Sequence, residues 1–215
     1  MPRGAKTKFS AEALEYLAEH ARQDEVLARV ESETAEMPRS GMQITPDQGA
    51  LLTVLAQLVQ AQDALELGTF TGYSAICIAR GLAPEGKLTC LELEQRFADI
   101  AQRNLTDAGV AEKATIEVGP ANEWLERQPE TERFDFVFLD ADKSGYPAYY
   151  ELLLPRMKPN GLLLIDNTLM DGDVVDPQDA STKAVAKLND AIAADERVDT
   201  AMALVADGLT FVRKR

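Results

Sequence analysis

Hydrophobic and polar positions along the chain alternate in blocks, with short apolar runs separated by longer amphipathic stretches. The apolar runs have five or six residues, the usual length of a strand. They predict strands at DALEL (63–67), LTCLEL (88–93), ATIEV (114–118), FDFVFL (134–139) and GLLLID (161–166). Helical patterns fill the gaps at GYSAICIARGL, QRFADIAQRNLTDAG, ANEWLERQ and YPAYYELLLPRM. Such alternation is typical of βαβ units, so we expect an α/β fold: a doubly wound, mainly parallel, Rossmann-like sheet with helices on both faces.

The pattern differs before and after this alternating region. Residues 10–36 form an acidic, Ala/Glu-rich helical segment, and a turn-rich stretch separates it from a long apolar helix that we expect to begin near Pro46. After a helix near 181–194, the runs TAMALVA and LTFVRK predict an antiparallel hairpin, which brings the sheet to seven strands. We therefore expect an N-terminal helical appendage at 1–40 and a single domain at 41–215.

Composition narrows the classes of partner. The chain has 215 residues and 46% hydrophobic content, which suits one sizeable core. A formal net charge of -14 argues against a nucleic-acid partner, because phosphate neutralisation needs clustered lysine and arginine. No apolar run approaches the ~20 residues of a membrane span, and the first residues lack the apolar core of a signal peptide. We expect a cytoplasmic protein without a membrane partner.

Cysteine and histidine offer little chemistry in this chain. Cys77 and Cys90 have no metal-type or redox spacing, and we expect both to be small buried hydrophobic residues. His20 is the only histidine and lies in an Ala/Glu-rich helical stretch, where a surface position is expected. Its solitude excludes di-histidine zinc sites, and any Ser-His-Asp triad would have to include it.

A glycine-rich turn follows the first predicted strand, in LELGTFTGYS (65–74). Gly68 and Gly72 allow the backbone to turn tightly and approach a ligand, and Ser74 with the amides of the next helix can bind an anionic group. The same spacing also occurs in ordinary strand-to-helix loops. It is neither the dinucleotide fingerprint GxGxxG nor a P-loop.

An acidic residue ends the second predicted strand. In a doubly wound fold, a carboxylate at the position of Glu92 can accept hydrogen bonds from both ribose hydroxyls of a nucleotide-like ligand. Together with the glycine turn, Glu92 indicates an adenosine-containing ligand. Glu94 is the competing candidate, although its position also suits an acidic residue that stabilises the first turn of the next helix.

Oxygen-bearing side chains end the fourth and fifth predicted strands. Asp140 follows one strand, and Asp166 and Asn167 follow the next. Three oxygen ligands without histidine or cysteine suit a hard divalent cation such as Mg²⁺, with Mn²⁺ or Ca²⁺ as alternatives. The competing interpretation is that the two aspartates cap helices.

Five segments together carry a family resemblance: LELGTFTGYSAICIA, LELE, FDFVFLDADKSGYPAYY, LLPRMKPNGLLLIDNTLMDGDVVD and DERVDTAMALVADGLTFVRK. They resemble the successive motifs of the cation-dependent class I O-methyltransferases, S-adenosylmethionine enzymes that include caffeoyl-CoA and catechol O-methyltransferases. The resemblance runs from about Met42 onward, and the pairing of DADK with DNT is its most specific part.

The resemblance implies roles for individual residues. Asp140, Asp166 and Asn167 match the metal ligands, and Lys143 matches the lysine that acts as general base. The matching S-adenosylmethionine contacts are Met42, Glu66, Gly68, Thr69, Phe70, Ser74, Glu92 and Ala121, with Asp140, Asp142 and Tyr149 beside cofactor or substrate. The family also implies a homodimer.

Two departures from the family bear on the substrate. The stretch between Val175 and the following helix is shorter than in the plant caffeoyl-CoA enzymes, whose insertion shapes the acyl-donor site. Asp142 stands where the animal catechol enzyme has an aromatic residue that forms part of its substrate wall. The expected substrate is a small phenol with two adjacent hydroxyls, which could chelate the cation.

Two other classes remain as alternatives. One is an NAD-dependent oxidoreductase on a Rossmann-type sheet, which the missing GxGxxG disfavours. The other is a cofactor-binding module without catalysis, which the intact set Asp140, Lys143, Asp166 and Asn167 disfavours.

Overall fold

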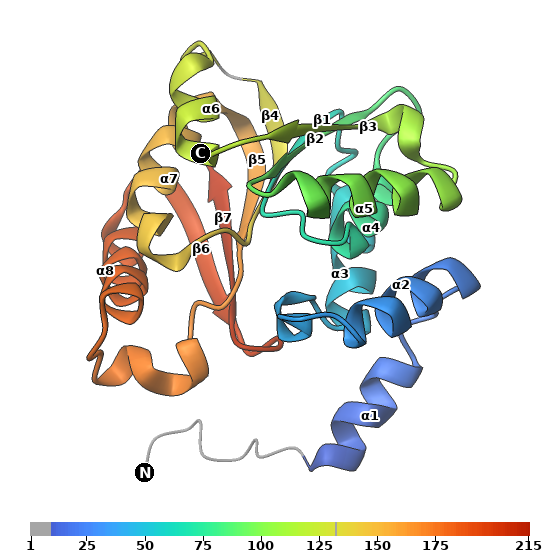
Figure 1. Cartoon of the computed structure of the whole chain (residues 1–215). Coiled ribbons are helices and arrows are strands. Elements are labelled where there is room, and N and C mark those ends of the chain that lie inside the picture. Colours follow the sequence, from blue (N-terminus) through green and yellow to red (C-terminus); the bar gives the residue numbers. More distant parts are fainter. Residues whose placement is uncertain (1–9, 132) are drawn as a thin grey trace.

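A seven-stranded sheet forms the centre of the computed structural model, which describes residues 10–131 and 133–215 (Figure 1). The strand order is β3-β2-β1-β4-β5-β7-β6. β1 to β5 run parallel, whereas β7 is antiparallel to both β5 and β6. The strands are β1 (Asp63–Leu67), β2 (Lys87–Glu92), β3 (Ala114–Val118), β4 (Phe134–Leu139), β5 (Met157–Ile165), β6 (Val198–Ala203) and β7 (Leu209–Lys214). This arrangement confirms the predicted fold class.

Helices cover both faces of the sheet (Figure 1). Apolar residues of α2 to α5 form a core with one face, and those of α6 to α8 form a second core with the other. The helices are α1 (Ala11–Glu19), α2 (Glu25–Ala35), α3 (Pro46–Leu58), α4 (Tyr73–Gly81), α5 (Gln95–Asp107), α6 (Ala121–Arg127), α7 (Tyr146–Leu153) and α8 (Ala180–Ala194).

The central strands β1 and β4 are apolar because both of their faces are buried. On β1, Ala64 packs into the core beneath α2 to α5, whereas Leu65 and Leu67 pack into the core beneath α6 to α8. β2 lies on one side of β1 and β4 on the other, so the chain reverses its direction of winding between β1 and β4. A crevice forms outside the carboxyl ends of the strands at such a point, which places the site there.

The predicted helical segment 10–36 is two helices in the structure. The chain breaks at Arg22, whose φ is 53°, and Asp24 then begins α2 by accepting a hydrogen bond from the Leu27 amide at 3.0 Å. α1 has no buried residue and extends away from the sheet (Figure 1). α2 instead buries Leu27 and Val30 in the same core as α3 and α4. The boundary predicted at residue 40 stays a prediction.

Three strands differ in extent from their predicted ranges, and β2 does so by a single residue at each end, since it runs from Lys87 to Glu92. β5 begins at Met157, four residues early, because a register shift opposite Phe134 and Phe136 accommodates the turn-like residues before Gly161. β6 begins at Val198 and ends at Ala203, so the end of the run TAMALVA forms the turn that leads to β7.

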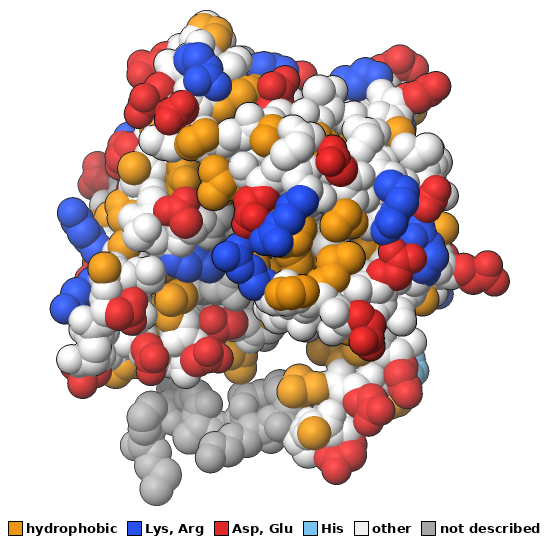
Figure 2. All heavy atoms as spheres, viewed as in Figure 1, with side chains coloured by type: hydrophobic (Ala, Val, Ile, Leu, Met, Phe, Trp, Pro, Cys, Tyr) orange, Lys and Arg blue, Asp and Glu red, His pale blue; other side chains and the backbone are white. Residues whose placement is uncertain are grey.

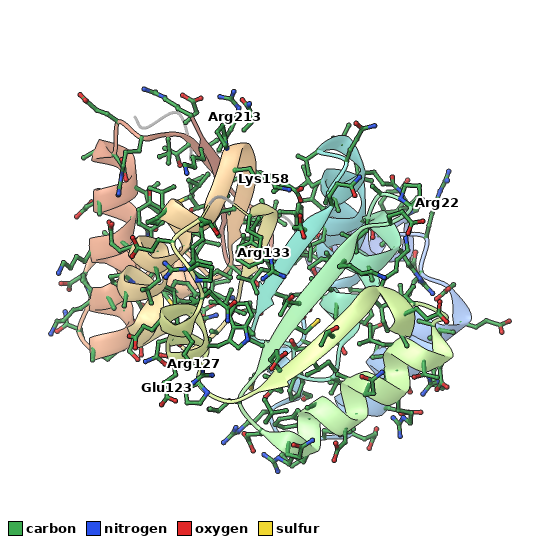
Figure 3. All side chains as sticks on the ribbon, turned by 90° about the horizontal axis from the view of Figure 1, so that it is seen from above. Arg22, Glu123, Arg127, Arg133, Lys158 and Arg213 are labelled. Atoms are coloured by element: carbon green, nitrogen blue, oxygen red, sulfur yellow. The ribbon has the colours of Figure 1, made fainter. Side chains whose placement is uncertain are left out.

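Ion pairs join the amino ends of three strands, at the edge of the sheet away from the crevice. Lys158 Nζ lies 3.1 Å from a carboxylate oxygen of Asp63 on β1 and 3.0 Å from one of Asp135 on β4. Figure 3 shows Lys158 in the view from above. The Asp135 carboxylate also accepts hydrogen bonds from the Gln62 and Asp63 amides. Side chains therefore fix this edge in addition to the backbone hydrogen bonds between the strands.

The remaining sequence predictions concern isolated residues and the surface. Cys77 and Cys90 are buried and unpaired, as predicted. His20 is exposed and stacks on Tyr16, with ring centroids 3.9 Å apart. No helix of the described part of the chain is both long and apolar enough to cross a bilayer. Figure 2 shows acidic side chains across much of one face, with basic and exposed apolar side chains among them.

Candidate active site

A cavity of about 950 Å³ lies at the carboxyl ends of β1, β2, β4 and β5. It has the size expected of a small-molecule site. Its wall contains every site residue that the sequence predicted except Glu66. The predicted residues on the wall are Met42, Gly68, Thr69, Phe70, Ser74, Glu92, Ala121, Asp140, Asp142, Lys143, Tyr149, Asp166 and Asn167.

The turn after β1 needs glycine at two positions. Gly68 has a φ of 89°, and a Cβ there would lie 2.2 Å from the carbonyl oxygen of Asp140. Gly72 has a φ of 88°, and a Cβ there would lie 3.0 Å from the Cβ of Ala101 on α5. The glycines therefore bring the loop against the end of β4 and against α5, which any side chain would prevent.

Glu92 and Glu94 have different surroundings, which separates the two candidates for a ribose contact. Glu92 is 6% exposed, and its carboxylate accepts hydrogen bonds from the Phe70 amide at 2.7 Å and the Thr69 amide at 3.3 Å. Glu94 instead forms ion pairs with Arg39 at 2.9 Å and Arg96 at 2.8 Å. Only Glu92 is held by the glycine-rich loop itself, in the position that the sequence predicted for a cofactor-binding carboxylate.

Glu66 lies beneath the cavity rather than on its wall. The residue is fully buried, and its two carboxylate oxygens have no hydrogen-bond partner within 3.5 Å among the described residues. Burial, with a smaller contribution from the negative charge of Asp140, raises the pKa of Glu66 to about 7. The predicted contact between Glu66 and the cofactor stays a prediction.

Lys143 occupies the tip of the loop after β4. Its Nζ donates hydrogen bonds to Asp140 Oδ1 at 2.5 Å and to the Tyr146 hydroxyl at 2.7 Å. The Tyr146 hydroxyl in turn donates to the carbonyl oxygens of Asp166 and Leu139, at 3.1 and 3.3 Å. This chain of bonds fixes the amine between the ends of β4 and β5.

Asp140 and Asp166 bring two carboxylates close together in a buried place. Burial raises the pKa of Asp140, although the Lys143 ammonium acts in the opposite direction. Burial raises the pKa of Asp166 as well, and the charge of Asp140 raises it further. Two carboxylates that oppose each other's ionisation form a site that a bound cation would stabilise.

The donor set fits a hard divalent cation. Asp166 and Asn167 follow β5 directly, and the backbone of Asn167 has a φ of 52°, a conformation that asparagine tolerates better than most residues. Residues 10–131 and 133–215 contain no group of three or more His, Cys, Asp or Glu side chains suited to a metal. The predicted set has two carboxylates and one amide, all oxygen donors of the kind that Mg²⁺ and Ca²⁺ prefer.

Asp142 has a structural task in addition to its place on the cavity wall. Its carboxylate begins a short 3₁₀ helix (Lys143–Gly145) by accepting a hydrogen bond from the Gly145 amide at 3.0 Å. It also accepts one from the Tyr149 hydroxyl at 2.5 Å. Lys143 pairs with Asp140 and not with this neighbour.

The site contains further residues that sequence reasoning missed, among them Tyr146, Arg39 and Asp207. Tyr146 holds Lys143, and its position three residues further along a helical turn was a usable signal. Arg39 and Asp207 line the cavity, but they come from the turn before α3 and the turn before β7. No motif marks either residue, because only the tertiary fold brings those turns to the crevice.

Comparisons with known proteins identify the family of the chain. The family model described as O-methyltransferase matches residues 17–215. The chain is 34% identical over 226 residues to caffeoyl-CoA O-methyltransferase of Eucalyptus gunnii, covering 98% of this chain and 91% of that protein. It superposes on the O-methyltransferase of Bacillus cereus in complex with SAH with a TM-score of 0.85 and 30% identity, covering 94% and 96% of the chains. For TomG of Streptomyces achromogenes, an O-methyltransferase of tomaymycin synthesis in complex with SAM, the TM-score is 0.83 and the identity 32%, covering 94% of each chain.

Proposed function

Because the chain belongs to the O-methyltransferase family, whose members use S-adenosylmethionine, we propose that it methylates one hydroxyl of a vicinal dihydroxy aromatic in a cation-dependent reaction. The observation that carries the proposal is the placement of Lys143 Nζ between Asp140 and Tyr146, beside the buried carboxylate of Asp166. A base beside two acidic oxygen donors is the arrangement that deprotonation of a metal-bound phenol requires. The family assignment sets aside an NAD-dependent oxidoreductase.

Asp140, Asp166 and Asn167 would hold the cation. When bound, a divalent cation stabilises a phenol oxygen in its ionised form and orients it for transfer of the methyl group of S-adenosylmethionine. The two aspartates supply the negative charge for this binding, and the Asn167 amide supplies a neutral oxygen.

Lys143 would remove the proton of the reacting hydroxyl. A neutral amine has two N–H bonds and one lone pair, and the contacts to Asp140 and Tyr146 can occupy both N–H bonds. The lone pair then remains for the substrate's proton, which Lys143 holds at Nζ while the methyl group is transferred.

Glu92 and the glycine-rich loop would bind the adenosine part of the cofactor. Glu92 lines the cavity, and its carboxylate is oriented by the amides of Thr69 and Phe70. A carboxylate oxygen accepts more than one hydrogen bond, so these contacts leave capacity for ribose hydroxyls. The enzyme's own contribution is largely the positioning of the two reactants.

The charge of the cavity wall supports a small phenol over a CoA ester. The described lining carries six carboxylate side chains and two cationic ones, Arg39 and Lys143. Such a wall attracts a sulfonium and a divalent cation, and it repels the phosphate groups of coenzyme A. The short stretch after Val175 points in the same direction.

A methyl-transfer assay tests the proposed reaction directly. The purified enzyme would receive S-adenosylmethionine and a panel of catechols, caffeoyl esters and hydroxylated flavonoids, with Mg²⁺ or with excess EDTA. We expect methylation of vicinal diols only in the presence of the cation. Matching monohydroxy phenols serve as controls, and equal turnover in EDTA would exclude the metal-dependent reaction.

We also propose that the enzyme is a cytoplasmic homodimer, as the family resemblance implied. The exposed apolar residues of α1 support an association, since Leu14 and Leu17 are 56% and 49% exposed on a helix without buried residues. Sedimentation velocity tests it: we expect twice the mass of the chain, and a monomer at micromolar concentration would contradict the proposal.

A further inference from the structure

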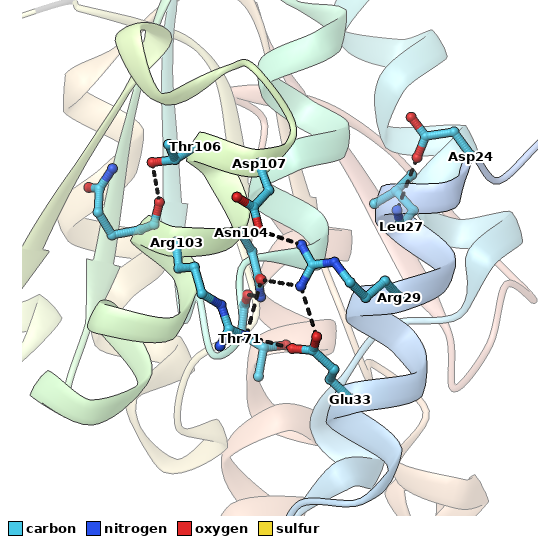
Figure 4. A network of polar contacts seen from close by, with 10 residues as sticks. Asp24, Leu27, Arg29, Glu33, Thr71, Arg103, Asn104, Thr106 and Asp107 are labelled. Carbon is cyan, nitrogen blue, oxygen red and sulfur yellow. Dashed lines mark hydrogen bonds and ion pairs between the residues drawn. The ribbon is translucent and has the colours of Figure 1, made fainter.

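The glycine-rich loop between β1 and α4 is tied to two helices outside the sheet. Thr71, a loop residue that is 1% exposed, accepts a hydrogen bond at its hydroxyl from the hydroxyl of Thr34 on α2, at 3.0 Å. Its carbonyl oxygen accepts one from the side-chain amide of Asn104 on α5, at 2.9 Å. Figure 4 shows Asn104 and Thr71 beside the helix that carries Arg29 and Glu33.

The orientation of the Asn104 amide is set by the charges around it. Its Oδ1 faces two guanidinium groups, with Arg103 at 3.4 Å and Arg29 at 3.5 Å. Guanidinium groups only donate hydrogen bonds, so they hold the oxygen end of the amide and leave the NH₂ group for the Thr71 carbonyl. Asn104 is itself 1% exposed, which makes a wrong orientation costly.

An outer layer of ion pairs joins α2 to α5 around this bond. Arg29 lies 2.9 Å from Glu33 on its own helix and 2.7 Å from Asp107 on α5 (Figure 4). Arg103 of α5 lies 2.5 Å from Glu33. These groups are partly exposed, so each pair contributes little free energy, and their main effect is to set the position of α2 relative to α5.

The loop needs such contacts because one of its residues, Phe70, has a backbone conformation that is unfavourable by itself. Gly68, Phe70 and Gly72 all have positive φ values, and the φ of 49° at Phe70 is strained for an aromatic residue. Glu92 holds the amides of Thr69 and Phe70 from the side of the cofactor site. Thr71 is the remaining loop residue, and its polar contacts run to α2 and α5.

We propose that Thr34 and Asn104 are positioning residues for S-adenosylmethionine. By holding Thr71, they keep residues 68–72 in the conformation that receives the cofactor before it arrives. Without them the loop would sample other conformations, and binding would have to select the competent fraction. The inference also makes α2 part of the cofactor site, although the sequence predicted that segment as an appendage. It rests on the use of S-adenosylmethionine and not on the proposed phenol.

The test compares cofactor binding in Thr34→Val, Asn104→Leu and the double variant with that of the wild-type protein. We expect each single variant to raise the Kd for S-adenosylmethionine, measured by calorimetry, roughly three- to tenfold, the effect of one lost hydrogen bond. Without cofactor, the amides of residues 69–72 should exchange with deuterium faster in the variants. The kcat at saturating cofactor should stay within about twofold, since the chemistry at Lys143 is untouched.

Two further variants separate positioning from general stability. Thr34→Ser keeps the hydroxyl and should restore wild-type affinity. Thr106→Val removes a hydroxyl from α5 that donates a hydrogen bond to the Gln102 carbonyl of the same helix, at 2.8 Å (Figure 4), and should leave the Kd unchanged. If the double variant stays folded with a lower melting temperature but a Kd within twofold of wild type, the two residues are merely structural and the inference is wrong.

Failure of this inference is distinguishable from failure of the proposed reaction. A wild-type protein that binds S-adenosylmethionine but methylates no diol contradicts only the proposed substrate and leaves the binding comparison intact. A wild-type protein that does not bind the cofactor overturns the inference itself. An equal loss of affinity in Thr106→Val would also overturn it, because that side chain does not reach the loop.

Discussion

The proposed base is a single atom, Lys143 Nζ, which is held by contacts to both Asp140 and Tyr146. Lys143→Met keeps the aliphatic stem and removes the base, so we expect kcat to fall by roughly 10² or more while the Kd for S-adenosylmethionine changes little. Steady-state kinetics over a range of pH would measure this. Lys183→Met, on the exposed side of α8, is the matched control. If Lys143→Met had the same pH–rate profile as the wild-type enzyme, Lys143 would not be the base and its charge would have only a structural role.

Asp166 is expected to act on the cation more than on the cofactor. Asp166→Ala should abolish turnover, and cofactor binding should survive within roughly tenfold, because the cation holds substrate rather than S-adenosylmethionine. Calorimetric titration with Mn²⁺ should show that the variant has lost the cation. The exposed Asp190 provides the control as Asp190→Ala. Retained turnover in Asp166→Ala would contradict the ligand assignment.

Glu66 gives the stability of the cofactor-free protein a particular pH dependence. Burial raises its pKa from 4.5 to about 7, so the folded chain keeps a proton that the unfolded chain has already lost. The free energy of unfolding therefore falls as the pH rises from about 4.5 to about 7, and this penalty persists at higher pH. Glu66→Gln should remove this contribution to the pH dependence of the free energy of unfolding. Above pH 7 we therefore expect the variant to be more stable than the wild-type protein.

Urea unfolding in EDTA, at several pH values across this window, would measure the difference. Glu126→Gln on the exposed side of α6 is the control for loss of a carboxylate. Parallel stability curves for Glu66→Gln and the wild-type protein would show that Glu66 does not carry the effect.

Among the elements, the loop after β1 offers a sharp test of backbone geometry. Gly68→Ala places a Cβ 2.2 Å from the Asp140 carbonyl, and we expect a loss of roughly 2–4 kcal/mol of stability and at least tenfold weaker cofactor binding. Gly109→Ala is the matched control, because its φ of 69° is also left-handed but no atom lies within 4 Å. It should cost only about 1 kcal/mol. Equal effects on cofactor affinity would contradict the close approach of loop and strand.

The sequence predicted most elements correctly where local pattern and tertiary environment agree. β1, β3 and β4 have the predicted bounds. The apolar side chains of β1 and β4 are buried, whereas the edge strand β3 buries Ala114 and, in part, Ile116. β5 and the pair α1 and α2 were misjudged, since a register shift and a single left-handed residue at Arg22 leave little trace in hydrophobic periodicity. Polar residues at strand ends were placed correctly on the cavity wall because the carboxyl ends of parallel strands converge. Arg39, Thr71 and Asp207 depend on long-range packing, which no local pattern encodes.

For the whole molecule, charge should decide which acceptors reach the site. The chain carries a net charge of -14, and acidic side chains outnumber cationic ones on the cavity wall. We expect the phosphate-free thioester of caffeate with N-acetylcysteamine to have a kcat/KM roughly tenfold or more above that of caffeoyl-CoA at low ionic strength. Salt screens these charges, so the difference in kcat/KM between the two thioesters should shrink as the salt concentration rises from about 0.01 M to 1 M. A preference for caffeoyl-CoA at low salt would contradict the electrostatic argument.

The order of β6 and β7 in the sheet has a consequence for biosynthesis. β7 follows β6 in the chain but separates it from β5, so β6 has no place in the sheet until β7 has left the ribosome. The turn between them carries Ala206 and Asp207, which line the cavity. A nascent chain that already contains Asp140, Lys143 and Asp166 thus still lacks one wall of its active site. The cavity wall is therefore complete only once β7 has joined the sheet, after the residues proposed to perform the chemistry have been synthesised.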